Sequence, residues 1–167
     1  MGVKGRLVEF LVEYDLIPAR VRWRKSASGV GRLFNDIFTI LDEDGRKSLT
    51  KLMYEWGLHD ADRLTKTLEI NKDLHSATIA LMAMHRVFGI KSHVAKEDSS
   101  EIVIHATQCL WKDKNGWTPK TCGAISTYEA GVIEGINPSI EHIYTKRRSQ
   151  GDSVCELILR TAKVAQP

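Results

Sequence analysis

The hydrophobic pattern of the chain changes its period at Gly89, and this change constrains the fold more than any other feature. Before Gly89, apolar residues recur at spacings of three and four, as on amphipathic helices. After it, residues 101–110 alternate strictly, with one side formed by Ile102, Ile104 and Ala106 and the other by Val103, His105, Thr107 and Cys109. A helical first part and a strand-rich second part predict an α+β protein.

The first part predicts helices over residues 4–14, 30–41, 48–57, 60–68 and 71–89. Pro18 ends the first helix, Ser48 caps the third, Gly57 closes it, and Gly89 is the C-cap of the last and longest. The acidic residues at 42–45 lack the spacing of a calcium-binding loop, and they predict a turn that leads into the next helix.

The second part predicts strands over residues 90–95, 101–110, 139–146 and 154–159, with a loop at 112–116. Thr118 and Pro119 are the expected start of a helix that runs to Glu134. The order is therefore ββ-α-ββ, which predicts a four-stranded antiparallel sheet with the helices packed on it. We expect one domain over 1–167, with a mainly helical part at 1–89 and a ligand-binding part at 90–163.

Composition restricts the function. The net charge of +3 is too small to indicate nucleic-acid binding, and no stretch approaches the ~20 apolar residues of a membrane span. Three cysteines without a CxxC pair argue against a disulfide scaffold, so we expect a cytoplasmic protein. Residues 19–28 hold four positive charges around Trp23. They are either a nucleic-acid patch or a solvated connector, and we expect the connector.

Three features follow one another in the second part: Cys109-Leu-Trp111 at a strand end, Cys122 at a helix start, and the turn Gly151-Asp-Ser-Val-Cys155. In these features the chain resembles two related groups, the 4-vinyl-reductase-type ligand-binding domains and the L-2-amino-thiazoline-4-carboxylic acid hydrolase-like proteins. The resemblance covers residues 48–160 in element order. It implies a pocket for a small organic ligand between Cys109 and Cys155, and an enzyme that hydrolyses a non-peptide C–N bond in a small heterocyclic acid.

Zinc is the one cofactor that the residues suggest, because thiolates and imidazoles are good zinc ligands. Cys109, Cys122, His142 and Cys155 are the candidate ligands if the fold gathers them. The resemblance implies that Cys122 and Cys155 match two zinc-binding cysteines of the 4-vinyl-reductase-type domains. Two other ligands of that group fall on Tyr144 and Arg147, which do not usually bind zinc. The alternative is three independent buried thiols.

For catalysis, the sequence suggests His142 with Cys109 or with Cys122, and first with Cys109, because a thiol beside an imidazole becomes a thiolate. The basic run at 146–148 offers a cation for a substrate carboxylate, with Arg147 as the candidate, although such a run is also typical of a solvated strand edge. Trp111, Cys122 and Tyr128 are candidate walls of the pocket. A non-catalytic alternative also stays open, namely a ligand-sensing module or one that forms a homodimer through its N-terminal helices.

Overall fold

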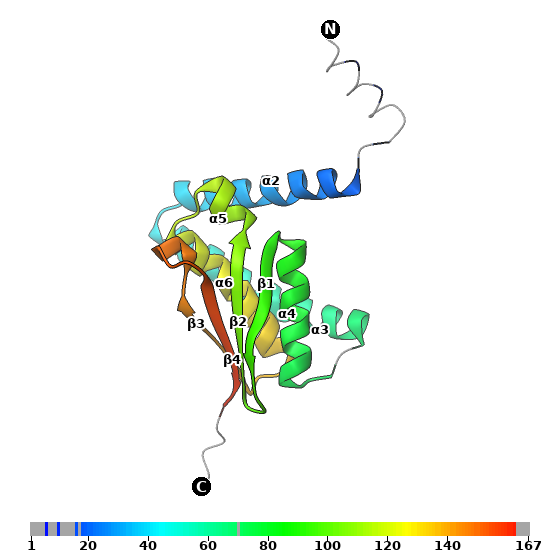
Figure 1. The fold of residues 1–167 in the computed structure, drawn as a ribbon. Helices are drawn as coiled ribbons and strands as arrows, with labels where there is room; N and C mark the ends of the chain where they lie inside the picture. The colour runs from blue at the N-terminus through cyan, green and yellow to red at the C-terminus, as the bar shows by residue number, and fades with distance from the viewer. Residues whose placement is uncertain (1–5, 7–9, 11–15, 17, 70, 163–167) are drawn as a thin grey trace.

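The computed structural model describes residues 6, 10, 16, 18–69 and 71–162. Its elements in chain order are α2 (Ala19–Ile40), α3 (Glu43–Leu68), α4 (Leu74–Val87), β1 (Ile90–Glu97), β2 (Glu101–Cys109), α5 (Leu110–Asn115), α6 (Pro119–Ile136), β3 (Ile140–Lys146), the 3₁₀-helix η1 (Arg148–Gln150) and β4 (Cys155–Thr161) (Figure 1). This order confirms the α+β class. The helix predicted at 4–14 falls almost entirely outside the described residues.

The sheet is antiparallel throughout, and its strand order is β1-β2-β4-β3. In its centre, Ile104 lies opposite Leu157 and Ile102 lies opposite Leu159. None of these four side chains is more than 2% exposed. The strict alternation in the sequence therefore predicted the strand correctly, and the side formed by Ile102, Ile104 and Ala106 is the buried one.

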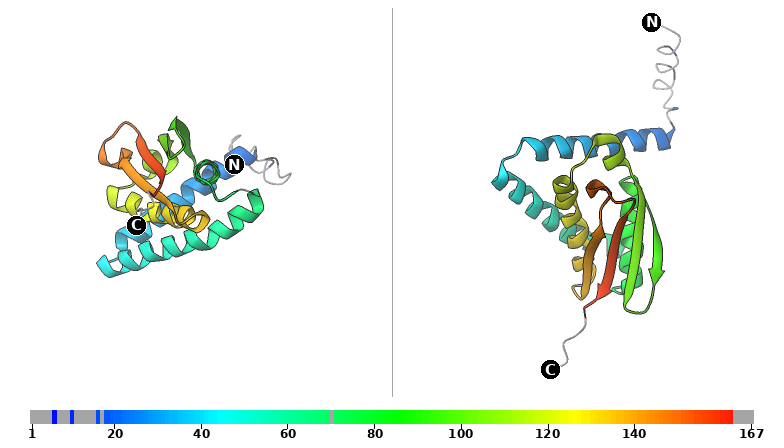
Figure 2. Two further views of the ribbon diagram at one scale, coloured as in Figure 1. Left: turned by 90° about the horizontal axis from the view of Figure 1, so that it is seen from below. Right: turned by 60° about the vertical axis from the view of Figure 1, so that its left-hand side comes forward.

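The helices form layers beside the sheet (Figure 2). α4 contacts β1, β2 and β4, α6 contacts β3, and α3 packs against α6. The core joins side chains of α4 and α6, such as Leu81 and Val132, to the inward residues of the central strands. Burial of this apolar surface is what stabilises the layered arrangement. Within the part of the chain that the structure describes, no helix has the combined length and hydrophobicity of a membrane span.

Helices α3 and α6 approach each other so closely that glycine is required where they touch. A Cβ on Gly57 would lie 2.2 Å from the carbonyl oxygen of Tyr128, and a Cβ on Gly131 would lie 2.2 Å from that of Tyr54. A glycine on each helix therefore lets the two backbones pack directly against one another. The sequence suggested that Gly57 closes a helix, and this prediction was wrong. Residues 43–68 form one continuous helix because tertiary packing outweighs the low helix propensity of glycine.

Two further elements differ from expectation. The helix predicted at 30–41 begins at Ala19, so residues 19–28 are helical and not a connector. Residues 110–115 form α5 where a loop was expected. Two indoles link this part of the chain to α2, since Nε1 of Trp111 in α5 donates to the Ala27 carbonyl (2.8 Å) and Nε1 of Trp117, just after α5, donates to the Gly31 carbonyl (3.0 Å). These contacts between distant segments are what the local pattern could not reveal.

Replacing Gly131 by alanine tests the close approach of α3 and α6. We expect Gly131→Ala to lower the free energy of unfolding by at least about 2 kcal/mol, because backbone atoms must move apart. Gly123→Ala is the matched control on the same helix, since nothing lies within 4 Å of its added Cβ. The control should stabilise the protein by about 0.5–1 kcal/mol through helix propensity. Urea unfolding gives the free energy of unfolding of both variants. Equal changes in the two variants would contradict the close contact of α3 and α6 at Gly131.

Candidate functional site

A cavity of about 50 Å³ lies where the end of β2 meets the first half of α6 and the turn between β3 and β4. Its lining combines thiols, indoles and a few polar groups. We call it the cysteine pocket, and its principal residues are Cys109, Trp111, Trp117, Cys122, Ser126, Glu129, Tyr144, Arg147, Ser149 and Cys155. Ile90, Ala106 and Ile125 complete its wall.

The structure brings together five of the seven residues that the sequence singled out. All three cysteines line the cysteine pocket, and Trp111 and Arg147 join them. His142 and Tyr128 do not line it. Segments separated by up to 46 residues in the sequence thus meet around one cavity, because antiparallel pairing places the end of β2 beside the start of β4.

Burial makes the thiols of the pocket poor nucleophiles. Removal from water raises the pKa of Cys109 to about 11, and it raises the pKa of Cys122 and Cys155 as well. The Cys155 sulfur accepts a hydrogen bond from the Arg148 amide at 3.3 Å. All three thiols are therefore protonated at neutral pH, whereas attack on a substrate requires the thiolate.

The structure does not bring Cys109 and His142 together as a catalytic pair. His142 lies opposite Leu159 on β4, and Leu159 lies opposite Ile102 on β2. Ile102 precedes Cys109 by seven residues, which is roughly 23 Å of extended strand. The two side chains therefore lie toward opposite ends of the sheet, and His142 cannot lower the pKa of this thiol by contact.

The same separation bears on the zinc prediction. Cys109, Cys122, His142 and Cys155 do not surround one point. Within the described part of the chain, no group of three or more His, Cys, Asp or Glu side chains could hold a metal ion. The residues present therefore do not fit the predicted site. Zinc stays a prediction that metal analysis of the purified protein would test.

A buried polar network that was not predicted from the sequence surrounds Glu129. The Glu129 carboxylate accepts a hydrogen bond from Tyr144 Oη (2.7 Å), and His85 Nε2 lies 3.2 Å from its other oxygen. His85 Nδ1 in turn lies 3.0 Å from Ser92 Oγ. A carboxylate at Nε2 favours the tautomer that donates there, which leaves Nδ1 to accept from Ser92. His142 Nε2 lies 3.5 Å from Glu129, without hydrogen-bond geometry.

Glu129 is 6% exposed, and it faces the cysteine pocket. Burial alone would raise the pKa of Glu129, but the interactions with His142 and His85 outweigh burial and hold this pKa below its ordinary value. The pKa of Tyr144 is raised by burial and by the neighbouring charge of Glu129. The network thus keeps an ionised carboxylate at the pocket wall. One signal was available in the sequence, because Glu129 lies on an otherwise apolar helix stripe.

Arg147 supplies the opposite charge. Its guanidinium lies 4.0 Å from the centre of the Tyr144 ring and donates to Ser126 Oγ at 2.8 Å. No carboxylate within the described residues forms an ion pair with this guanidinium, whose chain neighbours Lys146 and Arg148 pair with Glu156 and Asp113. Arg147 is therefore a partly buried cation that faces the pocket and can accept an anionic partner.

Tyr128 lines a neighbouring apolar cavity of about 240 Å³ instead, where its hydroxyl donates to Asp60 (2.8 Å). This second cavity shares Trp111, Trp117 and Ile125 with the cysteine pocket. The two indoles stack with their centroids 4.7 Å apart and their planes at 17°. They form the partition between the two cavities.

Comparison with known proteins gives this geometry a context. The L-2-amino-thiazoline-4-carboxylic acid hydrolase family matches residues 33–159, which is most of the chain. The chain belongs to this family. No curated protein matches the chain in sequence. The family match includes all ten principal residues of the cysteine pocket.

Two solved structures share the fold. One is the phenol-responsive sensory domain of the transcription activator PoxR with phenol, with a TM-score of 0.58 and 13% identity, covering 81% of this chain and 74% of that one. The other is a trafficking protein particle complex subunit 3 from Naegleria fowleri covalently bound to palmitic acid. It has a TM-score of 0.60 and 17% identity, and the match covers 89% of this chain and 99% of that one. At such identities the likeness concerns the fold alone.

Substitution of Glu129 tests the buried network. Glu129→Ala leaves the buried His85 and Tyr144 without their acceptor and removes the charge beside His142, so we expect a loss of about 3–5 kcal/mol in the free energy of unfolding. Glu134→Ala, at an exposed site on the same helix, should cost less than about 1 kcal/mol.

The network also predicts how stability depends on pH. Because the pKa of folded Glu129 is lowered, the stabilisation by its carboxylate is fully present above the ordinary glutamate pKa of ~4.3 and is lost progressively as pH falls below it. The difference in unfolding free energy between wild type and Glu129→Gln should therefore shrink on acidification. A difference that grows as pH falls would show that the pKa of Glu129 is not lowered.

The raised pKa of Cys109 predicts slow alkylation. In a variant with Cys122→Ser and Cys155→Ser, we expect iodoacetamide to react with native Cys109 at pH 8 at least about 10-fold more slowly than in urea. The rate should continue to rise with pH to about 11, following the thiolate. A native rate that levels off near neutral pH would show an activated thiol and would restore Cys109 as a nucleophile.

Proposed function

We propose that the protein binds a small organic acid in the cysteine pocket and that Arg147 pairs with the carboxylate of this ligand. The observation that carries the proposal is the guanidinium of Arg147, which faces the pocket without a carboxylate partner among the described residues. A buried or half-buried cation is stabilised by an anion, and a guanidinium binds a carboxylate through two parallel hydrogen bonds.

The charge of Glu129 extends this proposal to the rest of the ligand. Arg147 and Glu129 line the same small cavity and carry opposite charges. A ligand with a carboxylate and a protonated nitrogen next to a ring carbon would satisfy both groups. This description fits the small heterocyclic acids after which the family is named, and it supports them as the ligand class.

Hydrolysis of a C–N bond follows as the proposed reaction. A water molecule adds to the carbon of that bond, Glu129 accepts the proton from the water, and the departing nitrogen takes this proton as the bond breaks. Glu129 is favoured over Cys109 as the proton acceptor because the carboxylate is ionised and the thiol is protonated. The lowered pKa limits the basicity of Glu129, so we expect a slow enzyme.

The size of the pocket sets a further condition. A cavity of about 50 Å³ holds only a few atoms, whereas typical ligand pockets enclose roughly 300–1,000 Å³. Binding of a heterocyclic acid therefore requires Trp111 or Trp117 to turn and join the cysteine pocket to the apolar cavity of about 240 Å³. Indole fluorescence should change when the ligand binds.

A second candidate function is a non-catalytic module that senses a ligand and forms a homodimer. The observation in its favour is a row of exposed apolar side chains on α2, namely Val30, Leu33, Ile37 and Ile40. Their spacings of three and four place them along one side of the helix. Light scattering of the purified protein, and a ligand that binds without turnover, would favour this candidate over the hydrolase.

Arg147→Gln tests the proposed function. We expect affinity for small heterocyclic acids to fall at least about 10-fold, because the charged donor to the carboxylate is lost. Isothermal titration gives the affinity, and NMR of the substrate follows cleavage. Lys146→Gln is the matched control, since Lys146 is exposed and pairs with Glu156 away from the pocket. Equal affinities of wild type and Arg147→Gln would reject this site.

A further inference from the structure

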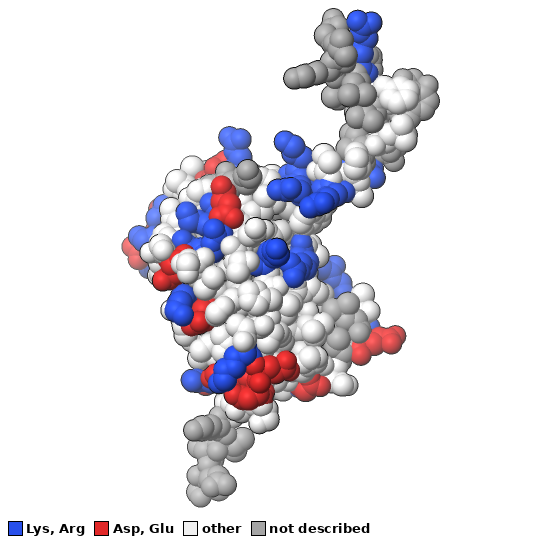
Figure 3. All heavy atoms as spheres, in the orientation of Figure 1, with Lys and Arg blue, Asp and Glu red and all other residues white. Residues whose placement is uncertain are grey.

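A third hollow, which differs in chemistry from the cysteine pocket, opens between the first half of α2 and the neighbouring ends of α4, β1 and β2. It has a volume of about 660 Å³. Five basic side chains line it, and we call it the basic groove: Arg20, Arg24, Arg86, Lys91 and Arg148, with Trp23 and Asp113. Figure 3 shows Lys and Arg gathered on both sides of this hollow.

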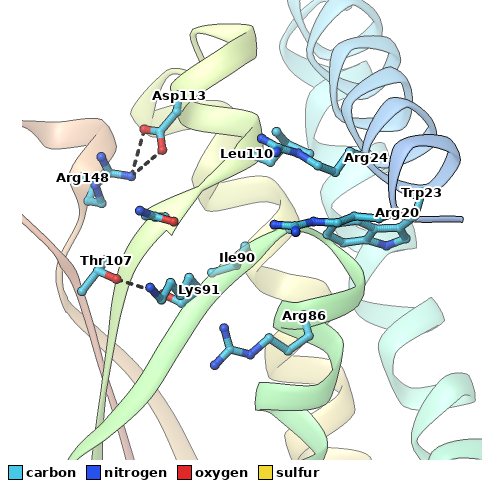
Figure 4. A pocket seen from close by; sticks show the side chains of 12 residues that line it. Arg20, Trp23, Arg24, Arg86, Ile90, Lys91, Thr107, Leu110, Asp113 and Arg148 are labelled. Carbon is cyan, nitrogen blue, oxygen red and sulfur yellow. Dashed lines mark hydrogen bonds and ion pairs between the residues drawn. The ribbon is translucent and has the colours of Figure 1, made fainter. Parts of the chain in front are cut away.

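The cations of the groove come from separate elements that converge. Arg20 and Arg24 extend from α2, Arg86 lies at the end of α4, Lys91 lies on β1, and Arg148 begins η1 (Figure 4). Arg20 and Arg24 lie one helical turn apart, so their side chains share a face of α2. The groove is thus a concave arrangement of charge and not a stripe along one helix.

These charges are poorly compensated. Asp113 is the acidic residue in the lining, and it pairs with Arg148 at 2.9 Å. It also accepts from the Cys109 amide at 3.2 Å. Arg86 donates to the Ser92 carbonyl (2.9 Å), but within the described residues no carboxylate lies within ion-pair distance of Arg20, Arg24, Arg86 or Lys91. Like charges held together in a concave site attract anions.

The indole of Trp23 adds a stacking surface. Its Nε1 donates to the Val87 carbonyl at 2.9 Å, which fixes the ring at the side of the groove. Trp23 is 38% exposed, so part of the ring is free to contact a ligand. An exposed ring beside guanidinium groups suits a ligand that has both a planar ring and negative charge.

We propose that the basic groove binds a small molecule that carries several phosphate groups and a planar ring, such as a nucleoside triphosphate. A single carboxylate would leave most of the cations unpaired, whereas a chain of phosphates offers oxygens to several of them. The volume lies within the range of small-molecule pockets. A nucleic acid fits less well, because the charges lie in a short hollow and the whole chain has a net charge of only +3.

Titration with ATP, tripolyphosphate and adenosine tests this proposal. At low salt we expect ATP to bind more tightly than tripolyphosphate, adenosine not to bind detectably, and affinity for ATP to weaken steeply as salt is added. Arg20→Gln combined with Arg24→Gln should lower the affinity for ATP at least about 10-fold. The control is Lys25→Gln combined with Arg32→Gln, which removes the same charge from α2 outside the groove. This pair should lower the affinity for ATP less than about 2-fold.

NMR of wild-type protein provides a readout that needs no variant. Tripolyphosphate should shift the amide signals of Thr107 and Gln108, which line the groove. Arg147→Gln should leave ATP binding unchanged. The proposals for the basic groove and for the cysteine pocket can therefore be rejected independently of each other. The proposal is overturned if ATP does not bind, or if the control pair loses as much affinity as the groove pair. Tighter binding to a single-stranded oligonucleotide or to phosphatidylserine vesicles than to ATP would overturn it in favour of those partners.

Discussion

The direct backbone contact between α3 and α6 at Gly57 and Gly131 is the constraint on which the candidate site depends. Because neither helix carries a side chain there, α6 packs at the short distance that also lets it contact the sheet. α6 carries Cys122, Ser126 and Glu129 into the cysteine pocket. A side chain at either glycine would force the two backbones apart, and any resulting shift of α6 would change the lining of the cysteine pocket.

The polar chemistry of the pocket follows from the same placement. α6 brings Glu129 to His85 of α4 and Tyr144 of β3, so one carboxylate joins two helices and the sheet. Such a charge is costly to bury unless its partners are in place. With its partners present, the carboxylate stays ionised in the cavity that Arg147 also lines. The pocket thereby combines protonated thiols with two fixed charges of opposite sign, which is a setting for binding a dipolar ligand.

The local patterns that failed did so for one reason. Gly57 looked like a helix end because glycine is a poor helix former. It lies inside α3 instead, where the lack of a side chain lets the helix contact the backbone at Gly131, 74 residues away in the sequence. Residues 19–28 looked like a solvated connector, yet they begin a helix whose later carbonyls accept hydrogen bonds from Trp111 and Trp117. Glu129 lies on an otherwise apolar helix stripe, yet its carboxylate interacts with His85 of α4 and Tyr144 of β3. In each case a distant contact outweighed the local preference.

The sequence by itself determined the α+β class and the strand that becomes β2, and its likeness to a known family pointed to the segment from Cys109 to Cys155, which supplies most of the lining of the cysteine pocket. Hydrophobic period and turn residues act over a few positions, and those positions are adjacent in the chain. Only the tertiary structure decided which polar groups share a cavity. Strand register placed His142 far along the sheet from Cys109, and helix packing placed Glu129 beside Tyr144, because both depend on distances between segments that no local pattern encodes.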